Sequence, residues 1–171
     1  MIERNSRLVR ELDSVLREEL RLQKEYAEIL NEERTSITTF KAEKVQSLSE
    51  KREVLSETIK RAAEKRAELM AMFPEHQGKR LSELIRAHCH PVDQERLMPL
   101  ADALKLAVQN TKSLSTEFKQ LASFSLNLVN GALSILWSAT QNVTRSYTPN
   151  GKIKESAHSS GNRQAGVLKE A

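Results

Sequence analysis

Apolar residues recur along the first seventy positions at alternating spacings of four and three, which is typical of helices that pack side by side. One such stretch runs from about Ser6 to Glu33, and a second runs from roughly Phe40 to Phe73. Glu19 interrupts the apolar series of the first stretch, and Arg52 and Arg66 interrupt that of the second. We expect each arginine to lay its alkyl stem on the apolar seam and to turn its charged head outward.

Helix-ending residues separate these stretches from the rest of the chain. The β-branched and capping residues at positions 35–39 predict a turn or kink. Pro74 and Gly78 predict the end of the second helix, and a short helix with an apolar edge is predicted from about Leu81 to His88. Pro99 predicts that the last helix starts there or is kinked near its first turns.

The last predicted helix carries the longest heptad series and continues to about Tyr147. A stretch without any charged residue runs from Gln120 to Thr144, and this stretch is long enough to cross a bilayer. Uncharged polar residues nevertheless form one stripe along it. That stripe consists of Gln120, Ser123, Asn127, Asn130, Ser134, Ser138 and Gln141. We therefore interpret this segment as amphipathic and not as inserted in a membrane.

Composition favours few and long elements, because only 5 of the 171 residues are glycine and 4 are proline. The predicted fold class is all-α: an elongated antiparallel helical bundle or coiled coil of three long helices and one short helix. Beyond Tyr147 the periodicity ends and Gly, Pro, Asn and Ser accumulate. We expect a helical bundle domain over residues 1–148 and a flexible, disordered C-terminal tail over residues 149–171 that orders on binding a partner.

Charge and cysteine content exclude several functional classes. The 27 basic and 23 acidic residues alternate in sign along the helices, which is typical of a solvated face and not of a nucleic-acid-binding stripe. The single cysteine, Cys89, and the absence of an apolar signal segment predict a cytoplasmic protein.

The sequence contains no recognisable catalytic or metal-binding constellation. The run His88-Cys89-His90 lacks the further ligands that zinc requires, and we interpret it as a polar helix end. No nucleophile elbow, P-loop or glycine fingerprint is present. We expect neither an enzyme nor a cofactor.

The apolar surface of the late helix has two interpretations, because it wraps far around the helix. Apolar stripes are usually buried, so the first interpretation is packing within the chain's own bundle. The second is a surface that receives an amphipathic partner helix. Both hold if an inward arc is core and an outer arc is a docking surface. Tyr147 is either part of an ordinary helix stop or an exposed anchor for a partner.

Residues spread over roughly Leu8 to Lys152 carry a resemblance to a known family. They are Leu12, Leu16, Leu20 and Tyr26 in the early helix, Lys51, Leu55 and Arg66 in the second, the late leucine-rich helix, and the ending Tyr147-Thr148-Pro149-Asn150-Gly151. With them the chain resembles the flagellar export chaperones of the FlgN type, whose late helix typically finishes with a tyrosine, three variable residues and a glycine. The family often has an asparagine at the start of the late leucine-rich helix. In this chain either Gln120 or Asn127 could occupy that position.

The resemblance implies a carrier that works without a nucleotide of its own. Such chaperones bind the C-terminal helical segments of flagellar hook-associated (hook–filament junction) proteins in the cytosol, prevent their premature assembly and deliver them to the export gate of the type III secretion apparatus. Tyr147 matches a tyrosine associated with docking on the cytosolic domain of the gate protein. The predicted partner-binding residues are Leu126, Val129, Leu133, Leu136, Trp137, Tyr147, Asn150, Gly151 and Ile153.

A structural coiled-coil scaffold that self-associates through its seams is the alternative. The wide apolar stripes are compatible with a monomer or with a homodimer.

Overall fold

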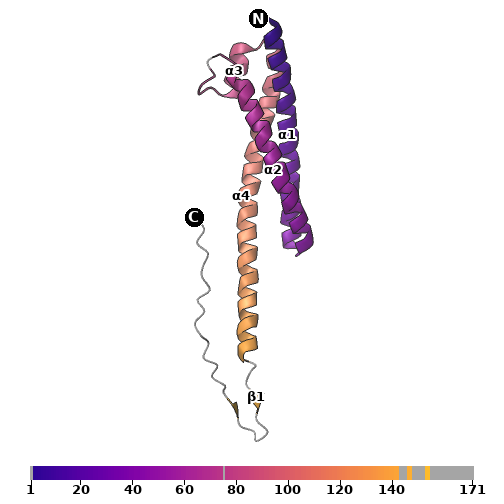
Figure 1. Ribbon diagram of the computed structural model, residues 1–171, viewed down its shortest axis with the longest axis vertical. Helices are drawn as coiled ribbons and strands as arrows, with labels where there is room; N and C mark the ends of the chain where they lie inside the picture. The colour runs from indigo at the N-terminus through magenta and orange to yellow at the C-terminus, as the bar shows by residue number, and fades with distance from the viewer. Residues whose placement is uncertain (1, 75, 143–145, 148–152, 155–171) are drawn as a thin grey trace. The chain divides into compact units, whose positions relative to one another are not determined.

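A computed structural model describes residues 2–74, 76–142, 146–147 and 153–154, with side chains described for residues 7–74 and 76–138. Its elements in chain order are α1 (Ile2–Thr38), α2 (Ala42–Ala71), α3 (Leu81–His88), α4 (Pro91–Asn142), β1 (Ser146–Tyr147) and β2 (Ile153–Lys154). The predicted all-α fold, with three long helices and one short helix, is confirmed (Figure 1). The chain divides into two units, residues 1–125 and residues 126–171.

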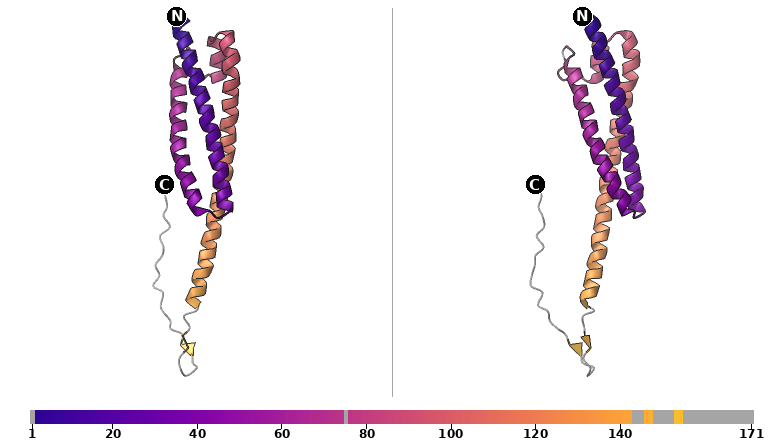
Figure 2. Two further views of the ribbon diagram at one scale, coloured as in Figure 1. Left: turned by 90° about the vertical axis from the view of Figure 1, so that its right-hand side faces the viewer. Right: turned by 45° about the vertical axis from the view of Figure 1, so that its right-hand side comes forward.

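In the first unit, α1 and α2 lie antiparallel along a common seam (Figure 2). Arg66 pairs with Glu19 near one end of this seam, and Arg52 pairs with Glu33 near the other. The two glutamate side chains are 2% and 1% exposed. The prediction that the arginine heads turn outward is therefore wrong. The buried carboxylates draw the guanidinium groups inward, because a buried charge needs a partner.

The turn between α1 and α2 is a Schellman motif, in which two backbone bonds close the end of a helix. The Lys41 N–H donates to the Ser36 carbonyl at 2.9 Å, and the Phe40 N–H donates to the Ile37 carbonyl at 3.1 Å. Phe40 takes the left-handed conformation, with φ of 55°, at the position where glycine is usual. The turn predicted from residues 35–39 thus lies at residues 39–41.

The first part of α4 runs parallel to α1, and the two helices lie side by side in Figure 2. Three side-chain contacts join the two helices, and from one contact to the next the residue numbers increase on both helices, as expected for a parallel pair. They are Arg96 with Asp13 at 3.4 Å, Thr111 with Gln23 at 2.8 Å, and Glu117 with Arg34 at 3.8 Å. Since α2 is antiparallel to α1, it is also antiparallel to this part of α4.

The main core lies where α3 closes the end of the bundle that holds the N-terminus (Figure 1). All four helices or their ends contribute to it. Its buried residues are Val9, Leu12, Val15, Leu16, Leu69, Phe73, Leu84, Ile85, Cys89, Leu97, Ala101 and Leu104. Leu84 and Ile85 are fully buried, which confirms the predicted apolar edge of α3.

One expectation about the α3–α4 connection is wrong. Cys89 does not belong to a polar helix end: it caps α3 in an extended conformation and is buried in the core. Of the two alternatives for Pro99, a helix start there is excluded, because α4 begins at Pro91 and Pro99 lies inside the helix near its first turns. Proline suits a first helical position such as that of Pro91, where no partner for its missing N–H is needed. The Gln94 side chain donates to the Cys89 carbonyl at 2.8 Å and thereby satisfies a group that α3 leaves open.

The second unit holds the end of α4 and a pair of two-residue strands. β1 and β2 are antiparallel, with Ser146 opposite Lys154 and Tyr147 opposite Ile153. The sequence did not predict this pairing, because two residues are too few for an alternating pattern to be recognised. The bounds of α4 are Pro91–Asn142, and Tyr147, which was predicted at the helix end, lies in β1.

Candidate partner-binding surface

The residues predicted to contact a partner on the late helix are all exposed. Leu126, Val129, Leu133, Leu136 and Trp137 are between 47% and 69% exposed. Phe124, Leu128 and Ile135 are exposed to a similar degree. In fact every residue from Leu126 to Ser138 is exposed. The interpretation that one arc is core is therefore wrong for residues 126–138, and the buried residues among the described part of α4 precede them.

The exposed apolar residues of positions 126–138 form one continuous arc around α4. At about 100° per residue, they span roughly 200° of the helix circumference. Leu126, Leu133 and Trp137 lie along one edge, and Leu128 and Ile135 lie along the other. Between the two edges lie Val129, Ala132 and Leu136. We call this surface the apolar arc.

Small and amide side chains occupy the opposite side of the same section. Asn127, Asn130 and Ser134 lie there together with Ser138, whose hydroxyl donates to the Ser134 carbonyl at 2.9 Å. None of these groups carries a charge. The section therefore offers apolar contact on one side and hydrogen-bonding groups on the other, without an electrostatic component.

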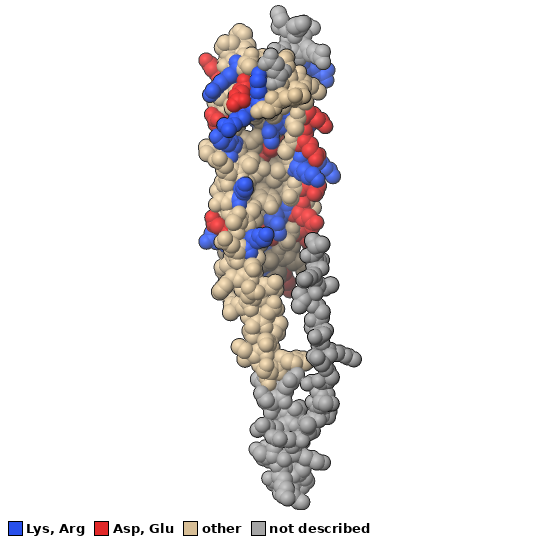
Figure 3. Space-filling view, turned by 90° about the vertical axis from the view of Figure 1, so that its left-hand side faces the viewer, with Lys and Arg blue, Asp and Glu red and all other residues tan. Residues whose placement is uncertain are grey.

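The bundle presents a different surface, because its outer faces are covered with charges. Figure 3 shows Lys, Arg, Asp and Glu gathered on the bundle, whereas the section of α4 that follows is tan. Exposed pairs such as Arg21 with Glu18 and Glu25 recur along α1. An exposed charged face keeps a helix soluble. The uncharged, exposed section of α4 lacks such a face and is therefore the candidate site for contact with another protein.

The late helix is long and apolar enough to cross a membrane when judged by length and composition. Among the described residues, one helix meets that test, over residues Pro91–Ser138, and none of its most apolar stretch is buried. The polar stripe described above argues against a lipid-facing role, since amides in hydrocarbon lack hydrogen-bond partners.

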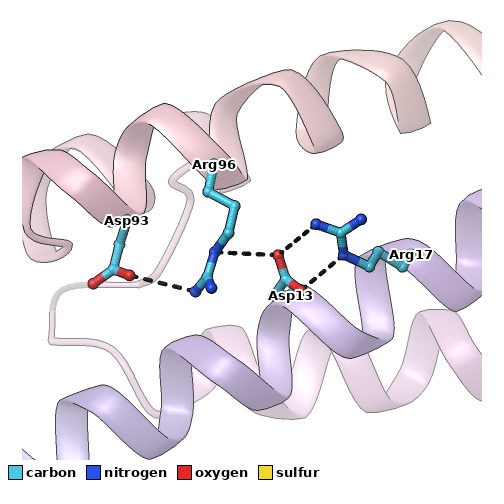
Figure 4. Close-up of polar contacts among 4 residues, drawn as sticks. All are labelled: Asp13, Arg17, Asp93 and Arg96. Carbon is cyan, nitrogen blue, oxygen red and sulfur yellow. Dashed lines mark hydrogen bonds and ion pairs between the residues drawn. The ribbon is translucent and has the colours of Figure 1, made fainter.

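Polar contacts hold the first part of α4 on α1. Asp13 lies between two arginines in Figure 4, accepting from Arg17 at 2.9 Å and lying 3.4 Å from Arg96. Arg96 also lies 3.4 Å from Asp93 on its own helix. The hydrogen bond and the charge of Asp13 raise the pKa of the Arg17 guanidinium.

A cation–π contact adds α2 to this anchor. The Arg52 guanidinium carbon lies 5.4 Å from the centre of the half-buried Phe118 ring on α4. Since Arg52 also pairs with Glu33, one side chain connects α1, α2 and α4.

The remaining predicted partner-binding residues lie after α4. Tyr147 and Ile153 face each other across the β1–β2 pair. Asn150 and Gly151 lie outside the described residues. The structure thus places Tyr147 and Ile153 together, although no sequence signal had connected them.

The described part of the chain offers no alternative site for metal chemistry. No group of three or more His, Cys, Asp or Glu side chains is placed there to hold a metal ion. Burial, and secondarily the charge of Asp93, raises the pKa of the Cys89 thiol, so this cysteine is protonated in the core.

These features define a class of protein: an all-α helical bundle whose late helix carries an exposed, uncharged apolar section over residues 126–138. The model of the FlgN protein family matches residues 1–155 of the 171-residue chain. The chain therefore belongs to the FlgN family, and it is a flagellar export chaperone. The family is one of chaperones and not of enzymes. No curated protein and no solved structure matches the chain.

Proposed function

We propose that this chaperone works in the cytoplasm, where it binds the C-terminal helical segments of flagellar hook-associated junction proteins. By covering those segments it prevents them from assembling early, and it then delivers them to the export gate. Family membership supports the flagellar cargo in general. The single observation that supports the binding site is the uncharged apolar arc of α4, which the chain itself leaves exposed.

The end of the chain completes the proposed binding region. Residues 1–148 would act as the helical carrier, and residues 149–171 as a tail that orders against cargo. Ordering a segment on binding lowers the net affinity, which suits a carrier that must release what it holds. Tyr147 is the proposed contact with the cytosolic domain of the gate protein. Its position after α4 and before the tail supports that assignment.

The test is to co-express the chain with a hook–filament junction protein and to measure the mass of the complex by size-exclusion chromatography with light scattering. We expect a soluble stoichiometric complex. A chain carrying Leu133→Ser and Leu136→Ser should lose it, because two hydrophobic contacts are removed from the apolar arc. The matched control is Val54→Ser on α2, a residue as exposed as Trp137 but outside the arc. This control should bind normally.

A second truncation tests the tail. A chain ending at Tyr147 should keep the thermal unfolding curve of the bundle and lose cargo binding. Unchanged cargo affinity would contradict the role proposed for residues 149–171.

The alternative is a coiled-coil scaffold, and the same exposed arc favours it as a second candidate. A scaffold would elute as a stable oligomer without cargo and would tolerate loss of residues 148–171. A monomer that acquires mass only with the junction protein would contradict it, and a homodimer that persists in the cargo complex would fit either role.

A further inference from the structure

The width of the apolar arc carries an inference about what covers it. A helix that packs on one side of a partner presents an apolar stripe about 100° wide, and a helix that is apolar over most of its circumference is one that is surrounded. The arc of α4 spans roughly twice that stripe. A single helix lying on it would leave either the edge with Leu126 and Leu133 or the edge with Leu128 and Ile135 in water.

The first part of α4 shows what a narrower stripe looks like in the same helix. There the buried residues Leu97, Ala101, Leu104 and Thr111 recur every three to seven positions on one side. Lysines occupy the exposed side, at positions 105 and 112. Between Ser125 and the end of α4 at Asn142 lysines are absent, and the positions that continue the spacing of Lys105 and Lys112 are Leu126 and Leu133. The change from a one-sided to a wide apolar surface occurs within one continuous helix, so the helical structure itself does not require it.

We propose that the apolar arc is covered by two neighbouring helical segments of one cargo chain, which pack on its two edges and meet over Val129 and Leu136. This inference rests on the proposed function and makes it more specific. The contacting faces of both segments are expected to be uncharged, because α4 offers no charge from Gln120 to Asn142 with which a charged face could pair.

A second copy of the chain would cover less of the apolar arc than two cargo helices would. In a two-fold dimer of two α4 helices, each helix covers only one stripe of the other, and half of each arc stays exposed. Only a trimer or tetramer of the chain would give every α4 end two neighbours. A trimer or tetramer observed in the absence of cargo would therefore show that other copies of the chain, and not cargo helices, cover the apolar arc.

The experiment compares the two edges of the arc in the full-length chain, with the junction protein as the titrated probe. One variant carries Leu126→Ser with Leu133→Ser, and the other carries Leu128→Ser with Ile135→Ser. If two helices cover the arc, each variant should weaken binding by at least about ten-fold, since each removes two buried apolar contacts. Asn130→Ser, on the polar side of the same section, is the matched control and should bind within about two-fold of the original chain.

The outcomes separate the two proposals. If the variant of one edge loses cargo binding and the variant of the other edge binds normally, the two-helix arrangement is overturned and the cargo function stays intact. Absence of any complex with the unsubstituted chain would overturn the proposed function itself. All the substituted residues are exposed and outside the core, so the variants should fold normally, and circular dichroism melting curves verify this.

Discussion

The Arg66 guanidinium holds the buried Glu19 carboxylate with two hydrogen bonds, from Nε to Oε2 at 2.7 Å and from Nη2 to Oε1 at 3.2 Å. Glu33 is held differently, because Arg52 Nε reaches only its Oε2, at 2.7 Å. Its Oε1 is buried and has no hydrogen-bond partner among the described residues. Two equivalent positions of one seam thus differ in how completely their charge is satisfied.

The first prediction compares the two glutamates. Glu19→Gln should lower the free energy of unfolding by about 1–3 kcal/mol, because it replaces a bidentate charged pair and leaves Arg66 beside a neutral amide. Glu33→Gln should cost less, since only one oxygen of Glu33 is paired. Urea unfolding of the two variants measures both values. Equal losses would show that the second hydrogen bond of Glu19 contributes nothing.

The second prediction concerns the pH dependence of stability. Burial raises the pKa of the Glu33 carboxyl above its ordinary value of 4.5, although the charge and hydrogen bond of Arg52 act in the opposite direction. The folded state therefore binds this proton more tightly than the unfolded state. The contribution of Glu33 is fully present below pH 4.5 and is lost as the pH rises through the raised pKa. Glu33→Gln should become more stable relative to the original chain as the pH rises from below 4.5 through the raised pKa. A constant difference over that range would contradict this assignment.

The third prediction tests the hydrogen bond that joins α1 to α4. The Thr111 hydroxyl donates to the Gln23 amide oxygen at 2.8 Å, and both side chains are buried. Thr111→Val should cost about 1–2 kcal/mol, because it leaves the amide of Gln23 without this donor. Adding Gln23→Leu should recover part of the loss, since both partners are then apolar. A double-mutant cycle measured by urea unfolding gives the coupling, and purely additive losses would contradict it.

The fourth prediction concerns the turn between α1 and α2. Phe40 is 81% exposed and holds a left-handed backbone conformation, which costs a side chain with a Cβ atom about 1 kcal/mol. Phe40→Gly should therefore raise the free energy of unfolding by roughly 0.5–1 kcal/mol. Phe40→Ala is the control and should give no such gain, because alanine keeps the Cβ atom. Thermal unfolding of the three chains distinguishes these outcomes.

The fifth prediction uses Trp137, which is the only tryptophan of the chain and is 69% exposed. Urea should melt the helices of the cargo-free chain with little shift in tryptophan emission, since the indole is already in contact with water. Binding of a junction protein should shift the emission to shorter wavelength and reduce quenching by acrylamide. A complex that forms without either change would place the cargo away from this side chain.

Periodicity in the sequence was sufficient to predict the number and order of the helices, but not every helix end. It predicted α3 with the bounds that the structure shows, because Gly78 and Pro91 flank a short apolar pattern. It also located the residues that interrupt the seams, but not the pairing of Glu19 with Arg66. Pairing depends on how two helices are aligned, and the pattern of a single helix does not contain that information.

The apolar section of α4 shows a second limit. A stripe of leucines is the same in sequence whether the chain itself or a different protein covers it. Only the three-dimensional structure shows that the first part of α4 has buried residues in the bundle, whereas all residues from Leu126 to Ser138 are exposed. Cys89 was misjudged for a related reason: its polar neighbours His88 and His90 concealed a position that faces the core.

The spacing of the two buried ion pairs limits how the chain can change in length. Glu19 and Glu33 are two heptads apart, as are Arg52 and Arg66, so one alignment of α1 and α2 pairs both. A slip by one heptad would place the glutamates opposite Ile59 and Phe73, or opposite Val45 and Ile59. Each carboxylate would then be buried against an apolar side chain, at a cost of several kcal/mol.

A single-residue insertion between the pairs in either helix would turn one of them by about 100° out of the seam. An insertion in the turn at residues 39–41 leaves both pairs aligned. During evolution, gains and losses of residues in the segment from Glu19 to Arg66 should therefore collect in that turn, and the helices on either side of it should keep the spacing between the two pairs.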